Sequence, residues 1–276
     1  AHGRSPSARP PTVDMAEAKA SVYVAASMAI WGKILGGAAG FAVGGPLGAL
    51  LGAAAGHAVD AIRDGGASDI AVDVDDRAPT RQIAFTIAVI VLGAKMAKAD
   101  GVVTREEIVA FRQVFQVPPE EIGHIGRLFD RARADPDGFE PYARQIARLF
   151  PSGSRVLEEL IDGLFHIAKA DGTVSPVELD YLRSVADIFG FSEAEFRRIR
   201  EGHVGSDMAD PYAVLGITRT SSDKEIKTVW RKLIRETHPD RLIAEGLPQE
   251  FIDLATRKVA IINAAYDQIS KERGLA

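Results

Sequence analysis

Residues 223–240, DKEIKTVWRKLIRETHPD, combine a two-faced helix with a stiff polar turn. At 100° per residue one face of this helix is apolar and the opposite face is basic. The apolar face consists of Ile226, Val229, Trp230, Leu233 and Thr237, and the basic face of Lys224, Lys227, Arg231 and Arg235. Pro239 fixes its own φ and biases His238 away from helical conformation. The sequence therefore predicts that the helix ends at His238-Pro239-Asp240.

Two further helices are predicted on either side of this stretch. Asp210–Gly216 forms a short helix that ends at glycine, and a long helix runs from about Pro248 to Lys271 after a loop over Asp240–Pro248. The long helix carries an apolar seam that matches the apolar face of 223–237, made of Val259, Ile262, Tyr266 and Ile269. The sequence thus predicts an antiparallel helical hairpin with a basic flank and an exposed polar tip.

The last 67 residues, 210–276, resemble the J domain of the Hsp40 (DnaJ-like) co-chaperones. The resemblance rests on D-P-Y-x-V-L-G, W-R-K-L, H-P-D-R and A-A-Y-x-x-I, which occur in this order and spacing. It implies that the domain binds an Hsp70 such as DnaK and stimulates its ATPase through His238, Pro239 and Asp240. The same resemblance implies docking contacts from Lys227, Trp230, Arg231, Arg235 and Arg241, with Trp230 in place of the usual tyrosine.

Residues 80–202 are predicted to be helical, and no alternating strand pattern competes, so the fold class is all-α. Predicted helices cover 80–98, 104–115, 118–133, 139–150, 154–169, 175–189 and 192–201. The uncharged run Gln82–Ala94 is too short to span a membrane and predicts a buried helix.

The string A-K-A-D-G-x-V-[ST]-x-x-E occurs twice, at 97–107 and 168–178. In each copy a glycine, Gly101 or Gly172, can end one helix in the left-handed conformation. A hydroxyl residue, Thr104 or Ser175, can then cap the next helix, and a glutamate three residues on closes a capping box. Pro176 occupies the first helical position, where proline is tolerated.

The same motif raises the question of a metal site. The first and third positions of an EF-hand alignment are not calcium ligands, so a conventional EF-hand is excluded. The two half-motifs together could still bind a divalent cation through Asp100, Glu107, Asp171 and Glu178, although the capping boxes explain these residues more simply. Otherwise no cofactor is expected. Residues 80–202 resemble the TerB-like helical domain, whose hallmark is two such motifs.

Near the start of the chain, Ile34 to Gly56 forms an uncharged run of 23 residues. As a helix it would be about 34 Å long, enough to cross a bilayer core. Its glycines recur every fourth residue on one helix face: Gly36, Gly40, Gly44, Gly48, Gly52 and Gly56. Such a stripe lets two membrane helices touch. Residues 28–60 are therefore predicted to be a self-associating anchor, with a flexible Gly/Ala linker or a soluble glycine zipper as the alternatives and a hairpin as a variant.

The remaining segments are predicted to be connections. Residues 1–27 are expected to be disordered, 61–79 form an acidic linker, and 203–209 form a second linker before the C-terminal domain, 210–276. The chain has 276 residues, a net charge of −5 and no cysteine, which argues against nucleic-acid binding and excludes thiol chemistry. No catalytic constellation is present, so the chain is not expected to be an enzyme. His124 and His166 are interpreted as structural.

The order of anchor, TerB-like domain and C-terminal J domain resembles the DjlA-like family of membrane-anchored co-chaperones. This implies a single-pass protein of the bacterial inner membrane with cytoplasmic C-terminal domains, a homodimer formed through the anchor, and recruitment of a cytoplasmic Hsp70. The client remains unnamed. A second hypothesis is a membrane stress sensor or scaffold whose central domain binds an ion or ligand, with the J domain secondary.

Overall fold

A computed structural model describes residue 48 and residues 78–100, 122–134, 138–170, 172–203, 209–245 and 247–275. Every regular element in these ranges is a helix, which confirms the all-α fold class. The N-terminal segment 1–27, the anchor apart from Gly48, and residues 61–77 of the acidic linker lie outside them. Among the helices of the described ranges, none has both the length and the hydropathy that crossing a bilayer requires.

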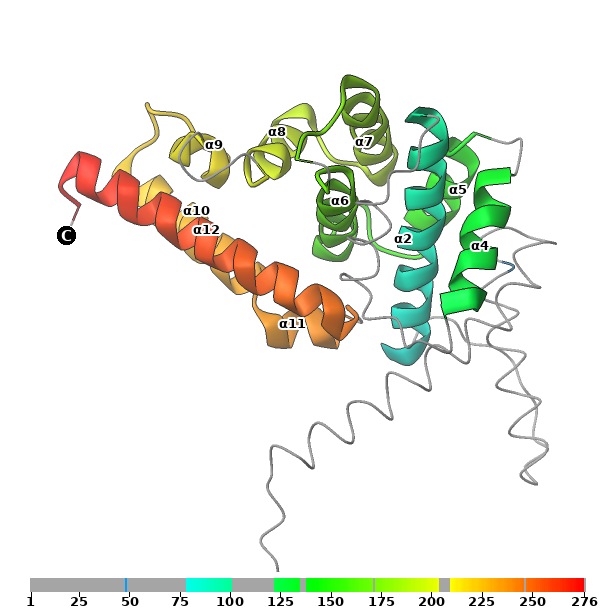
Figure 1. The fold of residues 1–276 in the computed structure, drawn as a ribbon. Coiled ribbons are helices and arrows are strands. Elements are labelled where there is room, and N and C mark those ends of the chain that lie inside the picture. Colours follow the sequence, from blue (N-terminus) through cyan, green and yellow to red (C-terminus); the bar gives the residue numbers. More distant parts are fainter. Residues whose placement is uncertain are drawn as a thin grey trace, which may run out of the picture.

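The central helices pack around α2, which is buried along most of its length (Figure 1). They are α2 (Ala78–Asp100), α4 (Ile122–Ala134), α5 (Glu140–Ala147), α6 (Arg155–Ala168), α7 (Pro176–Phe189) and α8 (Glu193–Glu201). Side chains on every side of α2 are almost fully covered, from Phe85 to Leu92. The prediction of a buried helix over Gln82–Ala94 is confirmed, because α4, α5, α6 and α7 all contact α2.

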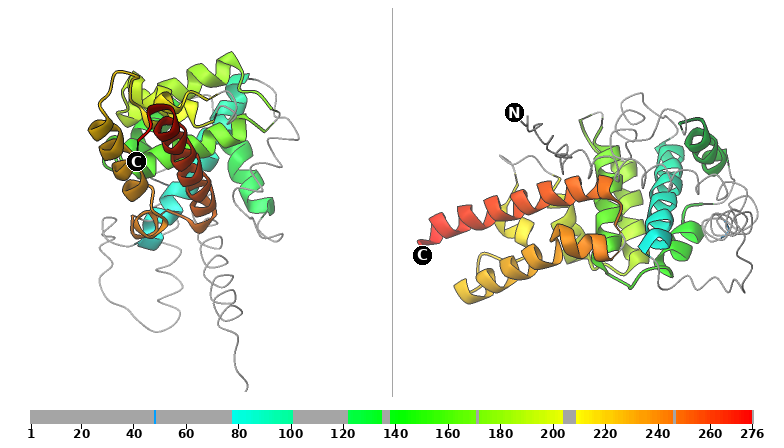
Figure 2. Two further views of the ribbon diagram at one scale, coloured as in Figure 1. Left: turned by 90° about the vertical axis from the view of Figure 1, so that its left-hand side faces the viewer. Right: turned by 90° about the horizontal axis from the view of Figure 1, so that it is seen from below.

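The C-terminal helices form a hairpin that projects from the central helices (Figures 1 and 2). They are α9 (Pro211–Leu215), α10 (Asp223–Glu236), α11 (Pro239–Ala244) and α12 (Gln249–Arg273). The predicted apolar faces of α10 and α12 meet in a separate core that includes Ile226, Leu233, Ile262 and Ile269. Val259 is only half-buried and does not join this core.

Two predicted boundaries are wrong. The stretch Asp240–Pro248 was expected to be a loop, but Pro239–Ala244 is helical, because Pro239 takes the first helical position and His238 serves as the N-cap. Helix α5 ends at Ala147, not at residue 150, and the chain continues in a tight turn. Pro151 disfavours helical conformation at Phe150, so it sets the latest possible end of the helix and does not explain the end at Ala147.

The C-terminal hairpin is packed into the central helices rather than tethered beside them. Leu242, Leu247, Phe251, Ile252 and Ala255 from α11 to α12 belong to the same buried cluster as the central helices. The ring of Phe251 meets that of Phe85 edge-on, with centroids 4.6 Å apart. A Cβ atom at Gly163 would lie 2.5 Å from Cε1 of Phe251, so α6 must carry glycine at this contact. The end of the hairpin that bears the polar tip is therefore held against α2 and α6.

Candidate functional site

The His238-Pro239-Asp240 tip is exposed to solvent at the start of α11. Nδ1 of His238 accepts a hydrogen bond from the backbone N–H of Asp240 at 3.2 Å, so the histidine caps the short helix with its own ring. The side chain of His238 is 56% exposed and that of Asp240 is 89% exposed. Neither polar side chain is needed to cover the core, and both are presented outward.

The predicted docking residues gather beside this tip in a shallow hollow of about 520 Å³. Its lining residues come from α10 and α11 and are Trp230, Arg231, Ile234, Arg235, His238, Asp240 and Arg241. The indole Nε1 of Trp230 donates to Oδ1 of Asn263 at 2.9 Å, and its ring stacks on Tyr266 with centroids 4.2 Å apart. These contacts hold the ring of Trp230 in place beside the hollow, whereas the side chains of Arg231 and Arg235 are exposed.

Two of the predicted docking residues have different surroundings. Lys227 is half-buried on α10 and does not line the hollow. Nε of Arg241 donates to Oε1 of Glu245 one turn further along α11, at 2.7 Å. The structure therefore brings together the tip and most of the predicted cations, with Lys227 outside the group.

The second copy of the repeated motif forms the predicted capping box. Oγ of Ser175 accepts from the N–H of Glu178, and Oε2 of Glu178 accepts from the N–H of Ser175 at 2.7 Å. Gly172 has a φ of +108°, and Pro176 is the first residue of α7. Of the four predicted cation ligands, the side chains of Asp100, Glu107 and Asp171 lie outside the described part. Among the described residues no group of three or more acidic or histidine side chains is placed to hold a metal ion.

Ser175→Ala should lower the free energy of unfolding by about 1 kcal/mol, because the backbone N–H of Glu178 loses its partner. Thermal melting of the full chain in detergent measures this, with Ser184→Ala in the same helix as the matched control. The same melts run in EDTA, Ca²⁺, Mg²⁺ and Zn²⁺ test the cation hypothesis. A rise of several degrees with one ion, lost in Asp171→Asn, would show that the motif also binds metal.

Sequence reasoning missed a cluster of buried charges where α12 lies against α6. Nζ of Lys258 contacts Oε1 of Glu158 at 2.6 Å, Oε1 of Glu159 at 3.1 Å and Oδ2 of Asp162. All three carboxylates are buried. The signal available in the sequence was the presence of three acidic residues within the otherwise apolar α6, which requires partners from another element.

Further side chains complete this cluster and tie the two groups of helices together. Arg155 contacts both Glu158 and Glu236, the latter at 2.9 Å across to α10. Arg198 from α8 contacts Oε2 of Glu158 at 2.6 Å. His203 contacts Asp162 at 2.6 Å through Nε2 and stacks on Phe165. The cluster therefore fixes how the hairpin sits on the central helices.

The pKa values of the three carboxyl groups in this cluster are shifted in different directions. Burial alone would raise the pKa of Glu158, but Lys258, Arg198 and Arg155 together lower it well below the usual range. Burial also opposes ionisation of Asp162, yet Lys258 and His203 lower its pKa. Burial raises the pKa of Glu159 to about 7, because Lys258 only partly compensates and Asp162 and Glu158 add repulsion. Oε2 of Glu159 is buried with no hydrogen-bonding partner among the described residues, which fits a neutral carboxyl.

Glu159→Gln should remove a pH dependence of stability. The folded chain holds the Glu159 proton up to about pH 7, whereas the unfolded chain releases it near the usual value of 4.5. The contribution of Glu159 to stability should therefore fall as the pH rises between these values, so the stability of wild type relative to the variant should decline over this range. Protonation of Glu158 and Asp162 changes the stability only at lower pH, because their pKa values are lowered. Melting curves from pH 5 to pH 8 measure the difference, with the exposed Asp253→Asn as control. Parallel curves for wild type and Glu159→Gln would contradict the prediction.

The histidines singled out from sequence do not form a site in the described part. His166 is half-buried on α6, and burial followed by the neighbouring Arg257 lowers its pKa. The side chain of His124 lies outside the described side chains.

Comparison with known proteins places three families along the chain. The profile of the co-chaperone DjlA transmembrane domain matches residues 28–75, that of the tellurite resistance protein TerB matches 86–201, and that of the DnaJ domain matches 210–274. The hollow at the tip therefore lies within the DnaJ domain, and the glycine-rich run lies within the transmembrane domain.

Two relatives match the chain over almost their whole length. The chain is 32% identical over 276 residues to the co-chaperone protein DjlA of Photobacterium profundum, covering 89% of this chain and 99% of that protein. It is 33% identical over 268 residues to the DjlA protein of Shewanella oneidensis, covering 90% of this chain and 100% of that protein. No solved structure matches. With its DnaJ domain at the C-terminus and its transmembrane domain near the start, the chain belongs to the DjlA family of J-domain co-chaperones.

Proposed function

We propose that this co-chaperone recruits a cytoplasmic Hsp70 of the DnaK type to the membrane and stimulates its ATPase through the His238-Pro239-Asp240 tip. The exposure of the tip beside a cationic hollow supports the proposal. Arg231 and Arg235 lie on the open side of α10, and the apolar side of α10 packs on α9 and α12. A partner with an acidic surface can therefore reach the tip without displacing any described helix.

A single-turnover ATPase measurement tests this function. The full chain in detergent micelles should accelerate ATP hydrolysis by DnaK, and the acceleration should weaken as NaCl is raised, because exposed cations steer the encounter. The chain alone should hydrolyse no ATP. Absence of acceleration at low salt would overturn the proposal.

We also propose a single-pass inner-membrane topology with residues 78–276 in the cytoplasm, because ATP and Hsp70 are found there. The match of residues 28–75 to a transmembrane domain supports the anchor. Protease added to inverted membrane vesicles should then digest the J domain. A protected J domain would overturn this orientation.

Gly44→Ile with Gly48→Ile should lower self-association in the membrane, because the added side chains hold two helices apart. Insertion should survive, since isoleucine is more lipid-soluble than glycine. A membrane dimerisation reporter fused to residues 28–60 measures the effect. Ala38→Ile with Ala42→Ile places the same side chains away from the glycine stripe and is the matched control. Equal association of both pairs would reject a homodimer formed through the stripe.

A further inference from the structure

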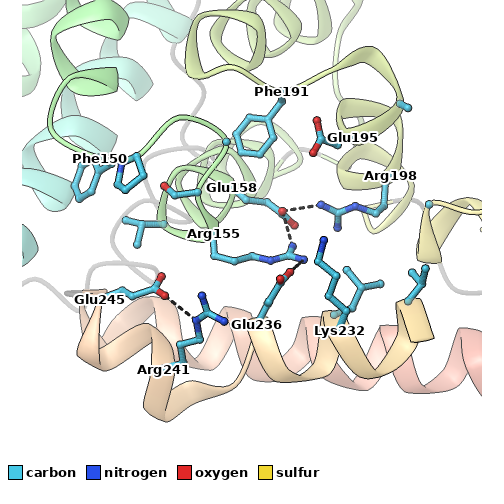
Figure 3. Close-up of a pocket in the computed structure, with 18 of the residues that line it drawn as sticks. Phe150, Arg155, Glu158, Phe191, Glu195, Arg198, Lys232, Glu236, Arg241 and Glu245 are labelled. Carbon is cyan, nitrogen blue, oxygen red and sulfur yellow. Dashed lines mark hydrogen bonds and ion pairs between the residues drawn. The ribbon is translucent and has the colours of Figure 1, made fainter. Parts of the chain in front are cut away.

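A second, larger hollow lies between the central helices and the C-terminal hairpin (Figure 3). This interdomain cleft has a volume of about 880 Å³. Its walls come from the turn before α6, from α8, and from α10 and α11. Helix α10 contributes Val229, Lys232, Leu233 and Glu236 to it, whereas the hollow at the tip uses other residues of the same helix. The cleft and the tip therefore lie on different faces of α10, with Arg241 at the border of both.

The carboxylates that line the cleft all have partners within the chain. Glu158 contacts Arg155 and Arg198, and Glu236 contacts Arg155 (Figure 3). Glu245 accepts from Arg241, and Oε2 of Glu195 accepts from the N–H of Ser192 at the start of α8. None of these four carboxylates is left to attract a cationic ligand.

Two basic side chains that line the cleft, unlike these carboxylates, have no partner among the described residues. Arg148 and Lys232 are exposed and line the cleft, and their side chains make no hydrogen bond or ion pair with any residue in the described ranges. Figure 3 shows Lys232 rising from α10 into the cleft, toward the side on which Arg155 and Arg198 lie. Arg148, in the turn after α5, lines the cleft from the central helices. The uncompensated charge of the cleft is therefore positive.

The cleft also has apolar surface in its lining. Leu149 and Val229 are half-buried, Pro151 is exposed, and all three line the cleft. A ligand in the cleft would therefore meet cations and aliphatic side chains.

We propose that the interdomain cleft binds an extended polypeptide segment in which carboxylates alternate with aliphatic side chains. Arg148 and Lys232 pair with the carboxylates, and the aliphatic side chains cover Leu149, Pro151 and Val229. The volume is that of a typical small-molecule site, so the cleft can accept a few side chains of such a segment while the rest lies outside it. Peptide binding itself requires no Hsp70. The use of the cleft for client segments rests on the proposed co-chaperone function, since such a segment would lie against the helix whose other face reaches Hsp70.

Fluorescence anisotropy with defined peptides tests the proposal. The probes are three fluorescein-labelled octapeptides that share three leucines and carry, respectively, three glutamates, three glutamines or three lysines at the same positions. The protein is the full chain in detergent micelles. The glutamate peptide should bind at least five-fold more tightly than the glutamine peptide and should lose affinity as NaCl is raised, and the lysine peptide should bind most weakly.

Variants of the cleft locate the binding. Arg148→Gln with Lys232→Gln should weaken binding of the glutamate peptide at least five-fold. Arg144→Gln with Lys271→Gln removes two exposed cations outside the cleft, from α5 and α12, and should change the affinity less than two-fold. Both pairs replace surface residues, and unchanged melting temperatures would show that folding is intact. Asp240→Asn should bind the peptide as wild type does, so loss of Hsp70 stimulation and loss of peptide binding are measured separately.

Three results would overturn the proposal. They are equal affinity for the three peptides, equal effects of the cleft pair and the control pair, and absence of peptide binding to the full chain. The last result includes the case in which another part of the chain covers the cleft.

Discussion

Asp240→Asn should abolish stimulation of the Hsp70 ATPase while leaving the melting temperature of the chain unchanged. The side chain of Asp240 is 89% exposed and contributes no buried contact, so its carboxylate is dispensable for folding. Its charge is nevertheless at the tip of a cationic hollow, where a partner must meet it. His238→Gln should have the same effect, because the ring is 56% exposed and only caps the short α11.

Single-turnover hydrolysis by DnaK with saturating full-length chain measures the loss, which should bring the rate back to that of DnaK alone. Asp253→Asn, an exposed aspartate on α12, is the matched control and should stimulate as wild type does. Undiminished stimulation by Asp240→Asn or His238→Gln would show that the tip is not the active element.

Lys258→Met should destabilise the chain by about 3–5 kcal/mol, the cost of leaving a buried charge without its partner. Nζ of Lys258 contacts three buried carboxylates of α6, and only 14% of the lysine side chain is exposed. Methionine has a similar length and fills the space, so the loss reflects charge rather than a cavity. Glu158 retains Arg155 and Arg198, but the ionised Asp162 retains only His203 among its described contacts.

Melting of the full chain measures this effect, with Lys271→Met on the exposed part of α12 as control. Adding Asp162→Asn to Lys258→Met should restore part of the lost stability, because the second change removes the stranded charge. A loss below about 1 kcal/mol for Lys258→Met would mean that water already screens the cluster.

Local patterns in the sequence predicted most of the described helices and the tip. The apolar and basic faces of residues 223–237, the break at Pro239 and the capping box at Ser175 and Glu178 depend on neighbours within one or two turns. Such short-range rules do not need the rest of the chain. The helix at Pro239–Ala244 was missed because it is too short to show an apolar period, although its proline and its cap were both visible.

The docking of the hairpin on the central helices could not be predicted in this way. Lys258 lies about 100 residues from its carboxylate partners, and Phe251 meets Phe85 across an even longer separation. The three acidic residues of the otherwise apolar α6 indicate that partners are needed, but the sequence does not say which distant cations supply them.

The sequence alone therefore determined the helices, their caps and the family, since each rests on local spacing or on motifs in order. The tertiary structure alone decided how the hairpin packs on the central helices, and hence where the interdomain cleft lies. Packing between distant helices sets this arrangement, because a buried charge is stable only when a partner from another helix is in contact with it.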